Sequence, residues 1–191
     1  MIKLGVLVSG RGSNLQAIVD ASDAGALDAR VSVVVSDRWD AFALRRIEGT
    51  GIPSVVIERG ACPTGEAFDN AIAGVLEERG VELVVLAGFM RVLGPGFVRR
   101  FQGRAINVHP SLLPSFPGLR AQRQALLHGV KISGCTVHLV DETLDGGPIL
   151  AQAAVPVLPD DTEDSLSERI LKEEHALLVR TIQEICRGGG M

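Results

Sequence analysis

Five apolar runs recur along the first half of the chain, and each ends at glycine, proline or a polar residue. They cover residues 3–8, 31–35, 54–57, 83–87 and 105–109. Continuous apolar runs of this length are typical of parallel strands that are buried on both faces. Between them, apolar residues recur at helical steps of three and four, as at Leu15, Ile18 and Val19. This alternation predicts an α/β fold built on a mostly parallel sheet.

The chain beyond Pro110 follows a different pattern. A proline-rich loop to Gly118 precedes a helix predicted at 120–128 and two strands predicted at 133–140 and 149–157. These two strands can pair as a hairpin, which would make the sheet mixed. An acidic helix start at 161–164 then opens a long closing helix. Its apolar face is supplied by Leu166, Ile170, Leu177, Leu178, Ile182 and Ile185.

A chain of 191 residues has the usual size of one domain with a substantial core. We therefore expect a single Rossmann-like domain of three layers, with a mixed C-terminal portion of the sheet and a long C-terminal helix. Residues 1–110 would form a phosphate-binding β/α half, and residues 111–186 the catalytic loop, the strand pair and the closing helix. Residues 187–191 would form a frayed tail.

Composition narrows the functional classes. The hydrophobic share is 46%, the net charge is −4, and no long run of one sign suggests a nucleic-acid-binding tail. No apolar run reaches membrane length, and the N-terminus lacks the core of a signal peptide. Cys62, Cys135 and Cys186 are widely spaced, which favours a reducing cytoplasm over a disulfide framework. We expect a cytoplasmic monomer or homodimer that acts on small molecules, without nucleic-acid or membrane partners.

A glycine-rich loop, Gly10-Arg11-Gly12-Ser13-Asn14, leads from the first predicted strand into a helix. Glycine allows close backbone approach, Ser13 and Asn14 can cap the helix, and free amides at a helix N-terminus favour a phosphate. A dinucleotide fingerprint is the rival interpretation, since Asp37 follows the second strand, but Leu15 occupies the place of the third glycine. A glycine turn without a ligand is the bland alternative. A monophosphate is the preferred occupant.

Asn107 and His109 stand two residues apart at the end of a predicted strand, so their side chains share one face. Pro110 ends the strand because it has no amide hydrogen. The pair would thus look out of the sheet's end, where α/β proteins bind ligands. Asp145, in the loop after the strand at 133–140, could orient the imidazole and favour its charged form. An amide that stabilises an oxyanion contributes about 3 to 4 kcal/mol. An imidazole, an amide donor and an orienting carboxylate are the usual groups for acyl transfer, so the three residues together indicate this chemistry.

Other candidate sites have weaker support. Ser111 could form a hydrolase triad with His109 and Asp145, but it lacks the Gly-x-Ser-x-Gly turn that exposes a nucleophile. His128, His138 and His175 look less promising as catalytic residues. None of them has the histidine or cysteine spacing of a metal site, so we expect no metal.

Four segments together resemble the phosphoribosylglycinamide formyltransferases, folate-dependent enzymes of purine synthesis. They are Gly12-Ser13-Asn14-Leu15-Gln16-Ala17-Ile18, Ala87-Gly88-Phe89-Met90-Arg91, Asn107-Val108-His109-Pro110-Ser111-Leu112-Leu113-Pro114 and Asp145-Gly146-Gly147-Pro148-Ile149. The likeness runs through nearly the whole chain in order. Methionyl-transfer-RNA formyltransferases and formyltetrahydrofolate deformylases share the catalytic segments but carry an additional domain, so we expect the single-domain type.

The resemblance implies a role for each matching position. Asn107, His109 and Asp145 would be catalytic, Gly12, Ser13 and Asn14 would bind the substrate phosphate, and Glu174 would reach the ribose hydroxyls. The pocket for 10-formyltetrahydrofolate, the formyl donor, would be formed by Met90, Arg91, Val92, Leu93, Val98, Asn107, Val140 and Asp141, largely through backbone groups. Two departures stand out: Gly65 falls where relatives can carry an arginine that holds an anionic substrate portion, and Leu171 where a polar residue can face the substrate.

The resemblance implies direct formyl transfer to the amine of 5'-phosphoribosylglycinamide. Two alternatives remain open from the residues alone. Water could replace the amine, which would make the protein a formyltetrahydrofolate hydrolase. The chain could also be a noncatalytic module that binds a phospholigand or a dinucleotide, although such a module has no use for Asn107, His109 and Asp145 together.

Overall fold

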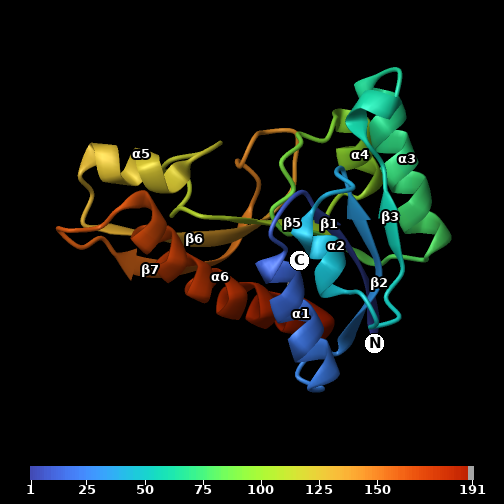
Figure 1. Cartoon of the computed structure of the whole chain (residues 1–191), viewed down its shortest axis with the longest axis horizontal. Coiled ribbons are helices and arrows are strands. Elements are labelled where there is room, and N and C mark those ends of the chain that lie inside the picture. Colours follow the sequence, from blue (N-terminus) through green and yellow to red (C-terminus); the bar gives the residue numbers. More distant parts are fainter. Residues whose placement is uncertain (189–191) are drawn as a thin grey trace.

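One sheet of seven strands runs through the molecule in the order β3-β2-β1-β4-β5-β6-β7 (Figure 1). A computed structural model describes residues 1–188 of the chain. The strands are β1 (Ile2–Val8), β2 (Ala29–Ser36), β3 (Ser54–Val56), β4 (Leu83–Leu86), β5 (Ala105–His109), β6 (Ile132–Leu139) and β7 (Ile149–Pro156). The first five pair in parallel, whereas β6 is antiparallel to both β5 and β7. The predicted α/β class, the hairpin and the mixed C-terminal part of the sheet are confirmed.

Helices cover both faces of the sheet and make the predicted three layers. They are α1 (Ser13–Asp23), α2 (Phe42–Arg46), α3 (Gly65–Glu78), α4 (Pro95–Arg100), α5 (Ala121–His128) and α6 (Glu163–Cys186), with a short 3-10 helix, η1 (Arg59–Ala61). Strand side chains alternate between the faces, so Val6 and Val8 pack in the cluster of α1 and α6, while Leu7 packs in that of α3 and α4. In Figure 1, α6 runs beside α1, away from α3 and α4.

The closing helix α6 begins where the acidic start predicts. Thr162 is its N-cap and forms a capping box with Ser165, while Glu163 and Asp164 occupy the first turn. Such a cap stabilises a helix by about 1 kcal/mol. The six apolar residues named for its inner face are all buried, so the helical pattern is confirmed.

Three short elements have no counterpart in the sequence prediction: α2, η1 and α4. Each has six residues or fewer, too few for a helical repeat of apolar residues to show. The tail expected at 187–191 lies, from residue 189 onward, outside the described part of the chain. Within residues 1–188, no helix has the length and apolar character needed to cross a membrane.

Candidate active site

The carboxyl ends of β1, β4 and β5 meet at one edge of the sheet. The parallel register pairs Leu7 of β1 with Leu86 of β4, and Leu86 with Asn107 of β5. The glycine-rich loop after β1, the segment after β4 and the end of β5 therefore emerge side by side. This is the edge at which open α/β sheets bind their ligands.

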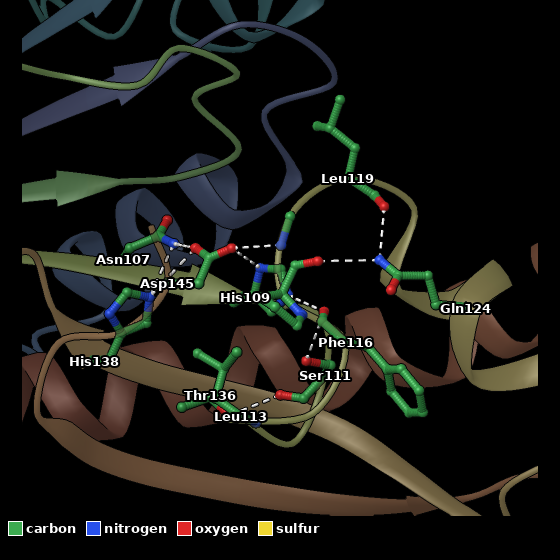
Figure 2. A network of polar contacts seen from close by, with 12 residues as sticks. Asn107, His109, Ser111, Leu113, Phe116, Leu119, Gln124, Thr136, His138 and Asp145 are labelled. Atoms are coloured by element: carbon green, nitrogen blue, oxygen red, sulfur yellow. Dashed lines mark hydrogen bonds and ion pairs between the residues drawn. The ribbon is translucent and has the colours of Figure 1, made fainter. Parts of the chain in front are cut away.

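Asp145 lies between Asn107 and His109 (Figure 2). Its Oδ2 is 3.4 Å from Nδ1 of His109, and its Oδ1 is 3.5 Å from Nδ2 of Asn107. The backbone amide of Gly118 donates to the same Oδ2 at 2.8 Å. Asp145 has a φ of 51°, which is uncommon outside glycine, so the loop holds it in a costly conformation in which the carboxylate reaches the strand end.

His109 is enclosed by acceptors. Its Nε2 lies 2.9 Å from the carbonyl oxygen of Phe116, and its Nδ1 faces Asp145. A carbonyl only accepts hydrogen bonds, so Nε2 carries a hydrogen in this arrangement. The ring can donate to both partners only as an imidazolium. His109 is 5% exposed, and its Nδ1 lies at ion-pair distance from Asp145, so the geometry suits an ion pair between a protonated His109 and Asp145.

A second imidazole, that of His138, completes the cluster. The antiparallel register sets His138 of β6 opposite Asn107, and Nε2 of His138 lies 3.2 Å from Nδ2 of Asn107. Its Nδ1 donates to the carbonyl oxygen of Leu139 at 2.8 Å, so Nε2 of the neutral ring is free to accept. Burial lowers the pKa of His138 and keeps the ring neutral. The sequence predicted no role for His138. The available signal is its step of two from Thr136, which places both side chains on one face of a strand.

Ser111 is built into the support of this cluster. It is completely buried, and its hydroxyl donates to the carbonyl oxygen of Ser115 at 2.5 Å. Its own carbonyl oxygen accepts from the hydroxyl of Thr136 at 2.7 Å. The hydroxyl therefore holds the loop that precedes α5, and the geometry does not support the hydrolase triad.

The glycine-rich loop takes a shape that differs from one expectation. Gly12, with a φ of 68°, is the N-cap of α1, so the prediction that Ser13 and Asn14 cap this helix is wrong. A Cβ on Gly12 would lie 2.6 Å from Cα of Ala43, so only glycine fits beside α2. The side chain of Asn14 instead donates to Oε2 of Glu174 at 2.8 Å. Burial raises the pKa of Glu174, and the hydrogen bond from Asn14 opposes this.

The segment after β4 lies between the glycine-rich loop and Asn107. Met90 and Val92 are mostly exposed, at 64% and 78%, whereas Leu93 and Val98 are buried. Val140 bonds to Ala105 of β5 through its amide and opens the loop that carries Asp145. Asp141 lies in that loop and accepts from the amide of Thr143.

Asp37 does not lie open to a ribose, as a dinucleotide site would need. Its side chain is 1% exposed, and its Oδ2 accepts from Nε of Arg91 at 2.7 Å. The guanidinium of Arg91 is thereby turned toward the loop after β2. Among residues 1–188, no group of three or more His, Cys, Asp and Glu side chains is placed to hold a metal ion.

Comparison with known proteins identifies the family of the chain. The family model described as formyl transferase matches residues 2–182. The phosphoribosylglycinamide formyltransferase of Escherichia coli K12 is 45% identical over 172 residues, which are 90% of this chain and 81% of that protein. The glycinamide ribonucleotide transformylase 1 of Symbiobacterium toebii superposes with a TM-score of 0.97 at 50% identity, covering 98% of this chain and 89% of that one. The chain belongs to the formyl transferase family.

Some relatives are much longer. The trifunctional purine biosynthetic protein adenosine-3 of Drosophila melanogaster is 48% identical over 188 residues, which are 97% of this chain but 14% of that protein. The chain likewise spans 14% and 19% of the corresponding proteins of Drosophila pseudoobscura pseudoobscura and Gallus gallus. It therefore corresponds to one part of these multifunctional proteins.

Proposed function

We propose that the chain transfers the formyl group of 10-formyltetrahydrofolate to the amine of 5'-phosphoribosylglycinamide. The products are 5'-phosphoribosyl-N-formylglycinamide and tetrahydrofolate, in a step of purine biosynthesis. The observation that carries this proposal is the position of Asp145, between the amide of Asn107 and the ring of His109, at the edge that also bears the glycine-rich loop. The names of the Escherichia coli and Symbiobacterium toebii relatives support the choice of acceptor.

The chemistry is direct transfer. The amine nitrogen bonds to the formyl carbon, and the carbonyl oxygen becomes an oxyanion. Asn107 and protonated His109 donate to that oxygen. The N–H of Asn107 that points at Asp145 over 3.5 Å is the weakly held one, and it can turn to the substrate while His138 holds the other. For His109 to donate from Nε2, the oxyanion would replace the carbonyl oxygen of Phe116 as its acceptor.

Proton movement completes the reaction. The attacking amine loses a proton, the bond from the formyl carbon to the folate nitrogen breaks, and that nitrogen gains a proton. Asp145, working through a water molecule and stabilising the imidazolium of His109, would carry this transfer. No covalent enzyme intermediate or metal is needed. The protein chiefly supplies alignment and a preorganised electrostatic environment.

Binding is divided among several segments that meet at the same edge of the sheet. Gly12, Ser13 and Asn14 would hold the phosphate at the start of α1, since free backbone amides favour an anion there. Glu174, fixed by Asn14, would accept from the ribose hydroxyls. The folate ring would lie against the backbone of Met90, Arg91, Val92 and Leu93. Val98, Asn107, Val140 and Asp141 would complete this pocket.

Arg59 can supply the positive charge that Gly65 lacks. Its Nη2 lies 3.8 Å from the point where a Cβ on Gly65 would be. Arg59 and Arg91 also line a cavity of about 570 Å³ beside Val92. In this proposal Arg59 supplies, from η1, the positive charge that relatives can place at position 65, and it would attract the anionic tail of the folate.

The setting is part of the same proposal. We place the activity in the cytoplasm, in a monomer or homodimer that acts on small molecules without nucleic acid or membrane. The three cysteines, all of which are free thiols, agree with a reducing compartment.

The direct test is to incubate the purified protein with 10-formyltetrahydrofolate, with and without 5'-phosphoribosylglycinamide, and to quantify formylated product and formate. The proposal expects formylated product that depends on the acceptor. Formate release at the same rate without the acceptor would favour hydrolysis, and binding of both ligands without turnover would favour a noncatalytic module.

A further inference from the structure

Three buried polar side chains converge on the segment Gly88 to Gly94. They are Ser9, Asp37 and Asp69, which are 6%, 4% and 8% exposed. They come from the end of β1, the loop after β2 and the second turn of α3. None of them belongs to the residues assigned above to catalysis or to ligand contact.

Ser9 fastens the beginning of the segment. Its amide donates to the carbonyl oxygen of Gly88 at 3.2 Å, and its hydroxyl accepts from the amide of Met90 at 2.8 Å. These bonds continue the β1–β4 pairing past the ends of both strands. Because Ser9 directly precedes the glycine-rich loop, the same residue joins the phosphate-binding loop to the folate-binding segment.

Asp37 and Asp69 fasten the middle and the end. Oδ2 of Asp37 bonds to Nε of Arg91 at 2.7 Å, and Oδ2 of Asp69 accepts from the amide of Gly94 at 2.8 Å. Gly94 is the N-cap of α4 and lacks a side chain of its own to serve that helix end. A Cβ on Gly94 would lie 2.8 Å from Oδ2 of Asp69, so the backbone approaches the carboxylate as closely as glycine permits.

These contacts matter because the segment has little else to hold it. Met90 and Val92 are mostly exposed, so apolar burial is confined to Phe89 and Leu93. A buried carboxylate is costly unless it is hydrogen-bonded. Burial raises the pKa of Asp69, and only the amide of Gly94 and the charge of Arg59 oppose this. A carboxylate kept at such a position is better explained by what it holds in place than by its contribution to packing.

We propose that Ser9, Asp37 and Asp69 are positioning residues for the formyl donor, which hold the backbone from Gly88 to Gly94 in the shape that receives the folate ring. The inference rests on the proposed function, because it takes that segment as the donor site. A preorganised segment does not have to be ordered by the ligand, which improves binding of the donor without touching the reacting atoms. Removal of one contact should therefore raise the KM for the donor more than it lowers kcat.

The most informative variants are at Asp69. Asp69→Ala removes the acceptor of the Gly94 amide, and we expect the donor KM to rise about tenfold, the effect of one buried hydrogen bond. The KM for 5'-phosphoribosylglycinamide should stay near the wild-type value. Asp69→Asn keeps an acceptor oxygen and should restore most of the donor affinity. Glu78→Ala, which removes an exposed carboxylate from the far end of the same helix, is the matched control.

Two readouts separate this inference from the proposed function. The first is hydrogen exchange of the peptide covering residues 88–94 in the unliganded proteins. Exchange should be faster in Asp69→Ala and Ser9→Ala than in wild type and Glu78→Ala, with Asp69→Asn near wild type. The second is calorimetric binding of tetrahydrofolate to the same proteins, with melting curves to show that each is folded.

Each result decides something. Faster exchange with weakened tetrahydrofolate binding in Asp69→Ala supports the inference. A wild type that binds tetrahydrofolate while Asp69→Ala and Ser9→Ala bind it equally well, with unchanged exchange, would overturn the inference and leave the proposed function standing. A wild type that binds no tetrahydrofolate and shows no turnover would overturn both.

Discussion

Asn107 and His138 face each other across the antiparallel pair of β5 and β6, with the amide nitrogen of Asn107 3.2 Å from Nε2 of His138. The carbonyl oxygen of Leu139 fixes the other ring nitrogen as a donor. The orientation of the amide thus depends on a ring that the proposed chemistry does not itself use. An amide turned the other way would present its oxygen where a donor is required.

Replacing His138 with phenylalanine removes this control. Phenylalanine keeps an aromatic ring at this position, but it has no nitrogen to accept from the amide of Asn107, so the amide can turn. We expect kcat to fall about tenfold, the value of one buried hydrogen bond, with little change in the KM for 5'-phosphoribosylglycinamide. Steady-state kinetics measures both constants. His138→Gln, which offers an acceptor oxygen, should recover part of the loss, and an unchanged kcat in His138→Phe would show that the ring does not orient Asn107.

Glu174→Gln should raise the thermal stability of the protein and weaken its binding of the ribose. Burial raises the pKa of this carboxyl because its charged form is costly to bury in the folded state. The stabilisation of the fold that comes from the protonated carboxyl is complete below the unfolded pKa of about 4.3. It is lost as the pH rises through the pKa of the folded state. Glutamine stays neutral, so the variant should melt above wild type at pH 7, and the difference should shrink toward pH 4.

The same variant should bind the ribose less well, because an amide is a weaker acceptor than a carboxylate. We expect a higher KM for 5'-phosphoribosylglycinamide and an unchanged KM for the donor. Melting curves at the two pH values and kinetics with each substrate varied in turn check this. A melting temperature below that of wild type at pH 7 would contradict the assignment of a burial cost to Glu174.

An ion pair at the start of α6 should contribute to the loss of stability of the fold at low pH. Arg169 donates to both carboxylate oxygens of Asp161, at 2.7 and 2.8 Å, and holds the pKa of Asp161 well below its usual range. The resulting stabilisation is present above the unfolded pKa of about 3.9 and is lost as the pH falls toward the folded value. Arg169→Met should therefore melt below wild type at pH 7, with the gap narrowing below pH 4. Thermal denaturation over this range is the measurement, and a gap that stays constant would exclude the ion pair as its source.

Arg59→Ala should weaken binding of the donor through its anionic tail. An exposed charge pair contributes up to about 1 kcal/mol, so we expect the donor KM to rise by about fivefold or less. A donor analogue that lacks the glutamate should bind the variant and wild type equally. Gly65→Arg in the Arg59→Ala background tests the exchange of positions, since it should restore affinity for the charged tail. Equal loss of affinity for both donors would place Arg59 outside the tail site.

The sequence was sufficient for the sheet and for part of the site. Buried strands can be recognised by continuous apolar runs. The step of two between Asn107 and His109 places both side chains on one face of a strand, and Pro110 marks the end of that strand. The predicted cap of α1 is wrong because Gly12, in a left-handed conformation and too close to Ala43 for a side chain, is the N-cap, and Ser13 is the first residue of the helix.

The roles of residues that act across the sheet could not be predicted from the sequence for another reason. The role of His138 depends on the register of β5 and β6, and those of Asp37 and Asp69 depend on contacts to Arg91 and Gly94 across 54 and 25 residues. No periodicity along the chain encodes such pairs. They follow only once the strand order and the helix packing are known, because these bring together the loops after β1, β2 and β4 and the helix α3.

In the proposed reaction, Asp145 and His109 act as one unit on a formyl group. The most direct measurement is the rate of formylated product from 10-formyltetrahydrofolate and 5'-phosphoribosylglycinamide in wild type, Asp145→Asn and His109→Ala. Glu142→Gln, which removes an exposed carboxylate from the same loop, is the control. We expect kcat to fall by about a hundredfold or more in both active-site variants, as for general acid-base groups, and to stay at the wild-type value in the control. Near-normal turnover in Asp145→Asn and His109→Ala would show that these two residues do not carry the formyl transfer.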